Sequence, residues 1–133
     1  MNVLELIEQA KEAAKYSYSP YSSFTVGAAL LAKSGEVYLG CNIENAAFSP
    51  SCCAERTAFF KAVSEGEREF EAIAIVGGKD GNFEIPCPPC GVCRQVMSEF
   101  CSFDFKIYLG TDTDEYAQYS LGELLPASFV LEE

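Results

Sequence analysis

Apolar side chains recur at helical spacing near the start of the chain. Asn2 precedes this segment and has a side chain suited to capping a helix. The apolar positions, three or four residues apart, are Val3, Leu6, Ile7, Ala10, Ala13 and Ala14. The pattern predicts an amphipathic helix that begins after Asn2 and is broken by Ser19-Pro20-Tyr21-Ser22-Ser23.

Strand and helix patterns follow along the rest of the chain. Two short strands are predicted over about residues 25–32 and 36–42, joined by the hairpin-like turn Lys33-Ser34-Gly35. The later predicted elements are a helix over 53–64 that ends at Gly66, an apolar strand over 71–77, a loop rich in Gly and Pro over 79–89, a helix over 90–101, a strand over 105–109, and a short strand with a helical turn over 116–125. This order predicts one α/β domain over residues 1–133, a three-layer αβα sandwich with a central mixed five-stranded sheet.

The composition favours a chain that also buries apolar surface between subunits. Hydrophobic residues make up 49% of the 133 residues and aromatic residues 13%, which is rich for a chain of this length. No apolar run reaches the roughly 18–20 residues of a membrane span, and the first residues show no signal-peptide pattern. We therefore expect no membrane partner.

The net charge and the distribution of cysteines indicate which classes of partner and which cellular compartment suit this chain. Twenty acidic and nine basic residues give a formal net charge of −11, which counts against a nucleic-acid partner. The seven cysteines are an odd number, and five of them fall in two tight clusters: Cys52, Cys53, Cys87, Cys90 and Cys93. This distribution favours metal or redox chemistry in a reducing, cytoplasmic compartment over a disulfide framework.

Two cysteine motifs indicate a catalytic zinc site. They read Cys53-Ala54-Glu55 and Pro89-Cys90-Gly91-Val92-Cys93, and the chain contains no histidine. Three thiolates can hold one Zn²⁺ and leave its fourth position to water, while a carboxylate two residues from Cys53 can move protons. The sequence therefore predicts hydrolysis by zinc-activated water, with Glu55 as the general acid and base.

The charge of such a site requires positive neighbours. Zn²⁺ and three thiolates sum to −1, which opposes ionisation of a bound water, and helix N-termini at the cysteines would offset part of this charge. Arg56, one helical turn after Cys53, is the natural donor to a thiolate sulfur. The alternatives are a surface ion pair for Arg56 and, for Glu55, the ordinary preference for an acidic residue in a first helical turn.

Two other uses of the thiols stay open from the residues alone. Cys87-Pro88-Pro89-Cys90 is itself a C-x-x-C motif, suited to a thiol–disulfide oxidoreductase. A set of four, with Cys87 added to Cys53, Cys90 and Cys93, would close a structural zinc site that has no position for water. If they neither bind metal nor become oxidised, Cys52 and Cys87 are expected to be small buried apolar side chains.

Four motifs in this order resemble the cytidine deaminase family, in particular its small, homotetrameric branch with three zinc-binding cysteines. Besides the two cysteine motifs, which extend to Arg56 and Gln95, the matches are Tyr18-Ser19-Pro20-Tyr21-Ser22-Ser23-Phe24-Thr25-Val26-Gly27-Ala28-Ala29 and Gly40-Cys41-Asn42-Ile43-Glu44-Asn45-Ala46-Ala47. A Pro-Cys-x-x-Cys motif with a Glu that is not a ligand is typical of zinc deaminases. The resemblance covers nearly the whole chain and implies the same fold.

The resemblance also implies the roles of individual residues. One Zn²⁺ per chain would be bound by Cys53, Cys90 and Cys93, with Glu55 as the proton shuttle and Arg56 beside the sulfurs. The nucleoside would be contacted by Phe24 as an aromatic wall, by Asn42 and Glu44 at the ribose 3′ side, by the backbone amide of Ala54 at the pyrimidine carbonyl, and by Phe129 of a neighbouring subunit. The reaction would convert cytidine or deoxycytidine, which both carry a 3′-hydroxyl, in a homotetramer with shared active sites.

The residues around the predicted sugar site favour a free nucleoside. Asn42 and Glu44 alternate along a strand end, so both side chains can face one pocket. No Lys or Arg lies in residues 18–32 or 42–53, so a 5′-phosphate would find no clamp and would be repelled by Glu44. Each of these residues also has a simpler structural explanation. Phe24 would be an ordinary core residue, Asn42 and Glu44 would only end a strand, and Phe129 would pack against its own domain. The loop Gly77–Pro89 looks longer than in small members of the family.

Overall fold

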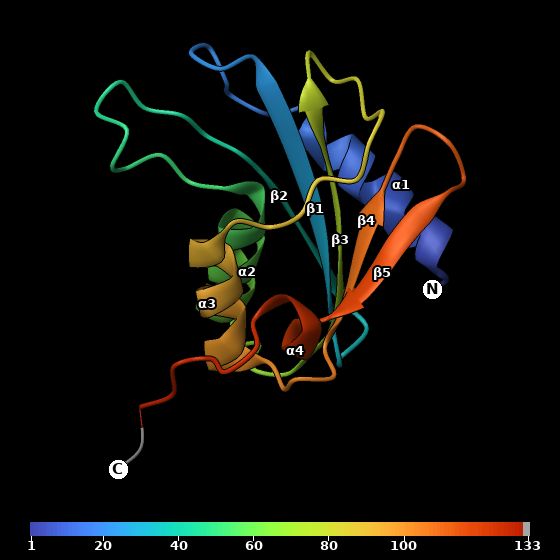
Figure 1. Cartoon of the computed structure of the whole chain (residues 1–133), viewed down its shortest axis with the longest axis vertical. Coiled ribbons are helices and arrows are strands. Elements are labelled where there is room, and N and C mark those ends of the chain that lie inside the picture. The colour runs from blue at the N-terminus through green and yellow to red at the C-terminus, as the bar shows by residue number, and fades with distance from the viewer. Residues whose placement is uncertain (132–133) are drawn as a thin grey trace.

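A computed structural model describes residues 1–131, arranged around a five-stranded sheet (Figure 1). Its elements follow the predicted order: α1 (Val3–Ala14), β1 (Phe24–Ala32), β2 (Val37–Cys41), α2 (Ala54–Ser64), β3 (Phe70–Lys79), α3 (Gly91–Phe100), β4 (Lys106–Gly110), β5 (Tyr116–Ser120) and α4 (Leu121–Leu124). Asn2 caps α1 as predicted, since its side chain accepts a hydrogen bond from the Glu5 backbone N–H.

The sheet is mixed, with the strand order β2-β1-β3-β4-β5. β1 pairs antiparallel with β2 and with β3, and β4 pairs antiparallel with β5. β3 and β4 are parallel, and the connection between them crosses a face of the sheet through α3. The predicted mixed five-stranded sheet is confirmed.

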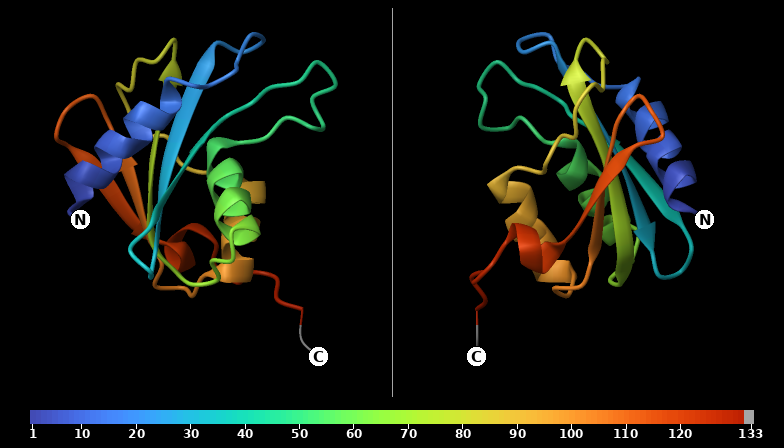
Figure 2. Two further views of the ribbon diagram at one scale, coloured as in Figure 1. Left: turned by 180° about the vertical axis from the view of Figure 1, so that it is seen from behind. Right: turned by 45° about the vertical axis from the view of Figure 1, so that its right-hand side comes forward.

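Helices cover both faces of this sheet, as the views in Figures 1 and 2 show. α1 packs on one face, and α2 and α3 pack on the other. Side chains of neighbouring residues in the central strands pack on opposite faces of the sheet. Leu30 and Ile73 pack against α2 and α3, whereas Ala29 and Ala74 pack against α1. Burial on both faces explains why β1 and β3 are nearly continuous apolar runs. The predicted three-layer αβα sandwich is confirmed.

Gly40 on β2 sets how closely α2 approaches the sheet. A Cβ atom at Gly40 would lie 2.3 Å from the Ala54 carbonyl oxygen and 2.6 Å from the Ala58 nitrogen. Ala54 and Ala58 are fully buried. This contact positions the first turn of α2, and with it Cys53, against the sheet.

β3 extends two residues beyond the strand predicted from the sequence. The prediction ended it at Gly77, but the backbone continues to Lys79 because Gly77 pairs with Val26 and Gly78 with Thr25. Glycine carries no side-chain signal for a strand, yet its backbone completes the ladder. The loop before α3 therefore begins at Asp80.

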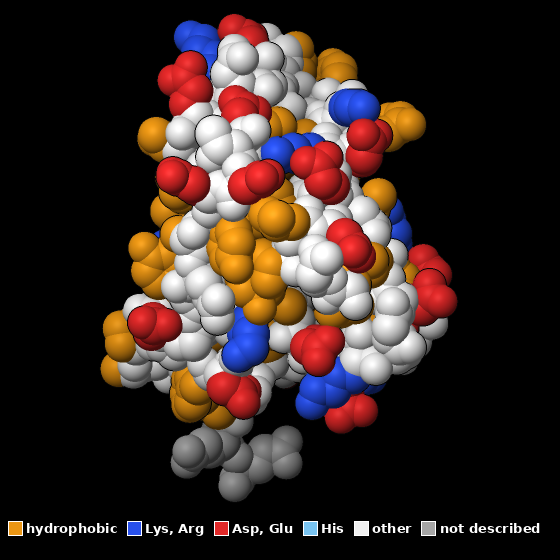
Figure 3. Space-filling model, turned by 90° about the vertical axis from the view of Figure 1, so that its right-hand side faces the viewer, with side chains coloured by type: hydrophobic (Ala, Val, Ile, Leu, Met, Phe, Trp, Pro, Cys, Tyr) orange, Lys and Arg blue, Asp and Glu red, His pale blue; other side chains and the backbone are white. Residues whose placement is uncertain are grey.

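The β5 side of the molecule is an exposed sheet edge. Figure 3 shows acidic side chains spread over this face among apolar ones. Tyr116 and Tyr119 of β5 are exposed. Within residues 1–131, no helix has the length and apolar character needed to cross a membrane.

Candidate metal centre and substrate pocket

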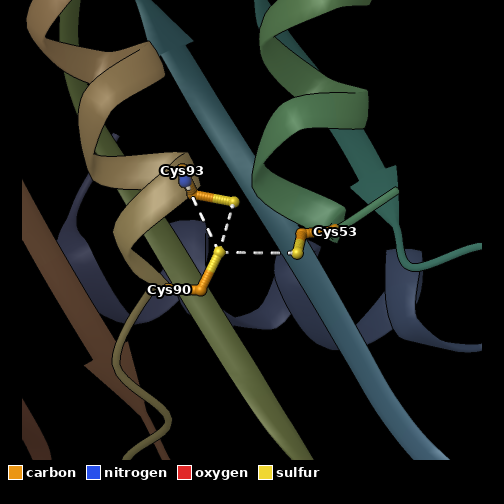
Figure 4. A group of neighbouring side chains, drawn as sticks. All are labelled: Cys53, Cys90 and Cys93. Atoms are coloured by element: carbon orange, nitrogen blue, oxygen red, sulfur yellow. Dashed lines mark hydrogen bonds between the residues drawn. The ribbon is translucent and has the colours of Figure 1, made fainter. Parts of the chain in front are cut away.

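Two helix N-termini bring three cysteine sulfurs together. Cys53 is the N-cap of α2, Cys90 is the N-cap of α3, and Cys93 lies in the first turn of α3. The Cys53 and Cys90 sulfurs are 3.7 Å apart, the Cys90 and Cys93 sulfurs are 3.5 Å apart, and all three lie within 4.8 Å of one another (Figure 4). Sulfurs bound about 2.3 Å from one tetrahedral ion lie about 3.8 Å apart, so this triad fits zinc.

Hydrogen-bond donors surround the sulfurs. Arg56 Nη2 donates to Cys53 Sγ at 3.4 Å, and the Cys93 backbone N–H donates to Cys90 Sγ at 3.5 Å. A hydrogen bond from the Cys93 thiol and then the Arg56 guanidinium lower the pKa of Cys53 to about 5, against the opposing effect of burial. The same hydrogen bond raises the pKa of Cys93. Cys53 is therefore ionised at neutral pH, and Arg56 and the N-terminus of α2 stabilise its negative charge.

Glu55 is a buried carboxyl group beside the triad. It lies in the first turn of α2 with 4% of its surface exposed, and it lines the same pocket as Cys53 and Cys90. Burial raises the pKa of Glu55 to about 7. A group with a pKa near neutrality can both accept and release a proton at neutral pH, which general acid–base chemistry requires.

Cys53 and Cys90 line a pocket with a volume of about 550 Å³, a size suited to a small molecule, whereas Cys93 is fully buried behind them. The structure brings most of the predicted site residues to this pocket: Phe24, Asn42, Glu44, Cys53, Glu55, Arg56 and Cys90. Arg56 is the sole Lys or Arg among its lining residues, and its guanidinium donates to a cysteine sulfur. The pocket thus combines a candidate metal-binding end with the polar side chains of Asn42 and Glu44 and with apolar side chains such as Phe24.

Asn42 is fixed by hydrogen bonds within the chain. Its Oδ1 accepts from the Val26 N–H at 3.0 Å and from the Ser17 hydroxyl at 2.5 Å, and its Nδ2 donates to the Phe24 carbonyl at 2.7 Å. These contacts join the end of β2 to the start of β1. Asn42 therefore holds the backbone that carries Phe24 as well as lining the pocket.

Glu44 is fixed by the turn that precedes β1. Its carboxylate accepts from the backbone N–H groups of Tyr21 and Ser22 at 2.9 and 3.2 Å, and also from the Ser22 hydroxyl. The hydrogen bond from the Ser22 hydroxyl, followed by that from the Tyr21 N–H, lowers the pKa of Glu44. Glu44 thus stays ionised at neutral pH.

Ser17 and Ser22 are positioning residues that the sequence analysis did not identify. The serine-rich turn indicated only a break after the first helix. Its proximity to residues 42–44 depends on an isolated bridge between Tyr18 and Ile43, a contact that no local pattern reveals. The one available signal was the density of hydroxyl groups in a turn that belongs to a recognised motif.

Two predicted substrate contacts are not side chains of the pocket lining. Ala54 is fully buried and is not among the residues that line the pocket, and its carbonyl oxygen lies next to Gly40. Phe129 is 70% exposed and does not line this pocket. It therefore does not pack into the core of its own chain.

Cys52 and Cys87 lie at the pocket but outside the triad. Both line it, and within residues 1–131 the converging sulfurs are those of Cys53, Cys90 and Cys93. Burial raises the pKa of Cys87 to about 11, so this thiol stays protonated at neutral pH. This arrangement does not favour the closed four-cysteine site or a reactive Cys87-Cys90 pair.

Fold and site together define a class, the α/β enzymes with an open zinc site at paired helix N-termini. A family model described as the cytidine and deoxycytidylate deaminase zinc-binding region matches residues 2–109. The chain therefore belongs to this family of zinc-binding deaminases, and the predicted resemblance is confirmed.

Individual relatives agree over nearly the full length of the chain. It is 49% identical over 133 residues to a cytidine deaminase of Sporosarcina psychrophila, covering 100% of this chain and 95% of that protein. It is 50% identical over 128 residues to a cytidine deaminase of Halalkalibacterium halodurans, covering 96% of this chain and 94% of that protein. The crystal structure of a Burkholderia pseudomallei cytidine deaminase superposes with a TM-score of 0.90 at 45% identity, covering 97% of this chain and 100% of that one.

Proposed function

We propose that the chain deaminates cytidine and deoxycytidine by hydrolysis, giving uridine or deoxyuridine and ammonia in pyrimidine salvage. The observation that carries this proposal is the juxtaposition of the cysteine triad with buried Glu55 in a pocket also lined by Asn42 and Glu44. The relatives described as cytidine deaminases support the choice of substrate.

Cys53, Cys90 and Cys93 would hold one zinc ion per chain. When bound, zinc supplies the Lewis acidity that activates a water molecule at the pocket. Arg56 draws negative charge from the Cys53 sulfur, and the N-termini of α2 and α3 act in the same direction. These donors offset the net negative charge that three thiolates bring to the site.

Glu55 handles the protons of the reaction. Its carboxylate accepts a proton from the attacking water and passes it to the ring nitrogen N3 of the cytosine. It then takes the second proton of the same water from the hydroxyl group now bonded to C4 and transfers it to the amino group. The C4–N bond breaks as the C4 carbonyl forms, and ammonia leaves. Its burial and its pKa of about 7 suit both directions of transfer.

The remaining pocket residues hold the nucleoside. Phe24 provides an apolar wall for the base, and the backbone amide of Ala54 donates to the pyrimidine carbonyl. Asn42 and Glu44 bind the ribose at its 3′ side, where Glu44 accepts from a hydroxyl group. The ionised Glu44 opposes a phosphate nearby, which supports a free nucleoside as substrate.

The working unit in this proposal is a homotetramer of single-domain chains, residues 1–133, in the cytoplasm. The exposure of Phe129 and of other apolar residues supports burial between copies. Phe129 would then cover the pocket of a neighbouring subunit. The unpaired cysteines support a reducing compartment.

One preparation tests the proposal through metal content and the ultraviolet change on cytidine deamination. Zinc with turnover supports it, whereas zinc without turnover indicates a structural zinc module and the absence of both indicates a thiol oxidoreductase. Glu55→Gln should keep zinc and lose activity by about 10²–10⁴-fold. Glu65→Gln, at the exposed C-terminal end of α2, is the matched control and should keep both. Full turnover in zinc-loaded Glu55→Gln protein would refute the mechanism.

The ligand set is tested by the zinc-to-chain ratio after dialysis. Alanine at Cys53, Cys90 or Cys93 should remove or severely weaken zinc binding. Alanine at Cys52 or Cys87 should retain it, because neither sulfur belongs to the triad. Zinc loss in Cys87→Ala would contradict this assignment and favour the closed four-cysteine site.

A further inference from the structure

A second cavity adjoins the substrate pocket. Its volume is about 510 Å³, and it lies between the end of β3 and the loop that leads from β3 to α3. The two cavities share three lining residues, namely Phe24, Cys87 and Pro88. None of the roles proposed above uses the second cavity.

The Cys87 side chain stands at the boundary between the two cavities. Its sulfur lies against β3, where a Cβ atom at Gly77 would be 2.6 Å from Cys87 Sγ and 3.3 Å from Phe24 Cε2. Gly77 thus allows a thiol and an aromatic ring to meet on the strand. The boundary is made by one of the smallest apolar side chains, because a protonated cysteine behaves as a small hydrophobic group.

The proposed function determines which part of the base faces this boundary. Carbon C4 lies at the metal, N3 lies at Glu55, and the pyrimidine carbonyl lies at the Ala54 amide. C5 is the neighbour of C4 on the opposite flank of the ring from N3. Several residues of the pocket lining have no role in those contacts, among them Cys52, Cys87 and Pro88. Of these three, Cys87 and Pro88 also line the second cavity, so we assign them to the C5 edge.

We propose that the second cavity is a subsite for a substituent on C5 of a cytosine nucleoside, and that Cys87 sets the size of substituent admitted. This inference rests on the proposed deaminase function and deepens it. Small neutral groups would pass beside the thiol toward Ile85 and Pro86, which line the second cavity. Removing side-chain volume at Cys87 would widen the passage, and adding volume would close it.

The experiment compares kcat/KM for cytidine, 5-methylcytidine and 5-propynylcytidine in zinc-loaded enzymes. Cys87→Ala should raise the ratio of 5-propynylcytidine to cytidine about tenfold, and Cys87→Met should lower it about tenfold, the effect expected for one or two carbon atoms in a pocket. Cys52→Ala is the matched control: it removes a thiol that lines the first pocket but not the second, so the ratio should not change. Calorimetric binding of the corresponding 5-substituted uridines should follow the same order without turnover.

Different results would overturn the C5 subsite and the proposed deaminase function. Equal substrate ratios in the wild type and both Cys87 variants, with normal cytidine turnover, would overturn the C5 subsite and leave the deaminase proposal intact. Failure of the zinc-loaded wild type to convert cytidine at all would overturn the proposed function, and the subsite with it. A change in the ratio for Cys52→Ala as large as for Cys87→Ala would also overturn the role of Cys87 as the boundary.

Discussion

Replacing Gly40 by alanine should disturb the metal centre without touching any ligand. The added Cβ would lie 2.3 Å from the Ala54 carbonyl oxygen, and Cβ atoms essentially never come closer than 3.0 Å to such a neighbour. The first turn of α2 must therefore move by about 0.7 Å, or by about 1.1 Å to reach the ordinary contact distance of 3.4 Å. The neighbouring atom is helix backbone, so no flexible side chain can absorb the shift.

This displacement is large compared with the tolerance of a metal site. Cys53 caps the turn that moves, while Cys90 and Cys93 belong to α3. Metal–ligand distances vary by about 0.2 Å in well-formed sites. We expect zinc affinity to fall roughly 10–100-fold, as when residues that orient metal ligands are lost, and stability to fall by about 1–3 kcal/mol from overpacking.

Zinc competition with a chromophoric chelator and thermal unfolding measure the two effects. Gly91→Ala is the matched control, because Gly91 lies between two of the ligands and no neighbouring atom lies within 4 Å of a Cβ built there. Alanine is also a better helix former than glycine, so this variant should keep its zinc affinity and its stability. Wild-type zinc affinity in Gly40→Ala would refute the view that the packing of α2 on β2 sets the ligand geometry.

Three further changes probe the surroundings of the site. The Arg94 guanidinium donates to the Pro89 carbonyl, just before α3, at 2.8 Å and to the Leu124 carbonyl, at the end of α4, at 2.7 Å. Arg94→Met should therefore lower the unfolding temperature and speed the release of zinc to a chelator. In the wild type, the Ser22 hydroxyl lowers the pKa of Glu44, so Ser22→Ala should return this pKa toward its usual 4.5. Glu44 would then become protonated at a higher pH on acidification, and KM for cytidine should begin to rise at that higher pH. A KM–pH profile identical to that of the wild type would contradict this prediction. Hybrid tetramers of Phe129→Ala and Glu55→Gln chains should regain activity on subunit exchange, and a monomer in sedimentation would contradict shared sites.

The sequence predicted the features that local patterns control. The helix after Asn2 and the hairpin at Lys33-Ser34-Gly35 depend on apolar spacing, capping and turn residues close in the chain. The cysteine motifs could be recognised for a similar reason, because Cys90 and Cys93 share one helical turn and Cys53 starts another helix. Spacing alone did not exclude Cys87, and the choice of these three cysteines came from the resemblance to cytidine deaminases.

The parts that the sequence did not predict depend on contacts between distant residues. Ser22 and Glu44 are 22 residues apart, and Ser17 and Asn42 are 25 apart, so their hydrogen bonds exist only once the chain is folded. The last two residues of β3 were missed because a glycine gives no side-chain signal for a strand, whereas its pairing with β1 is a tertiary property.

Substitutions should have different effects beneath α2 and in the loop before α3. The proposed ligand Cys53 lies at the start of α2, which packs against the sheet through a buried contact at Gly40, so few substitutions at this contact should be compatible with zinc. The boundary residue Cys87 lies instead in the loop between Asp80 and α3, where side-chain volume can change without moving a ligand helix. Substitutions in that loop should therefore alter which bases are accepted, while substitutions beneath α2 should alter whether zinc is retained.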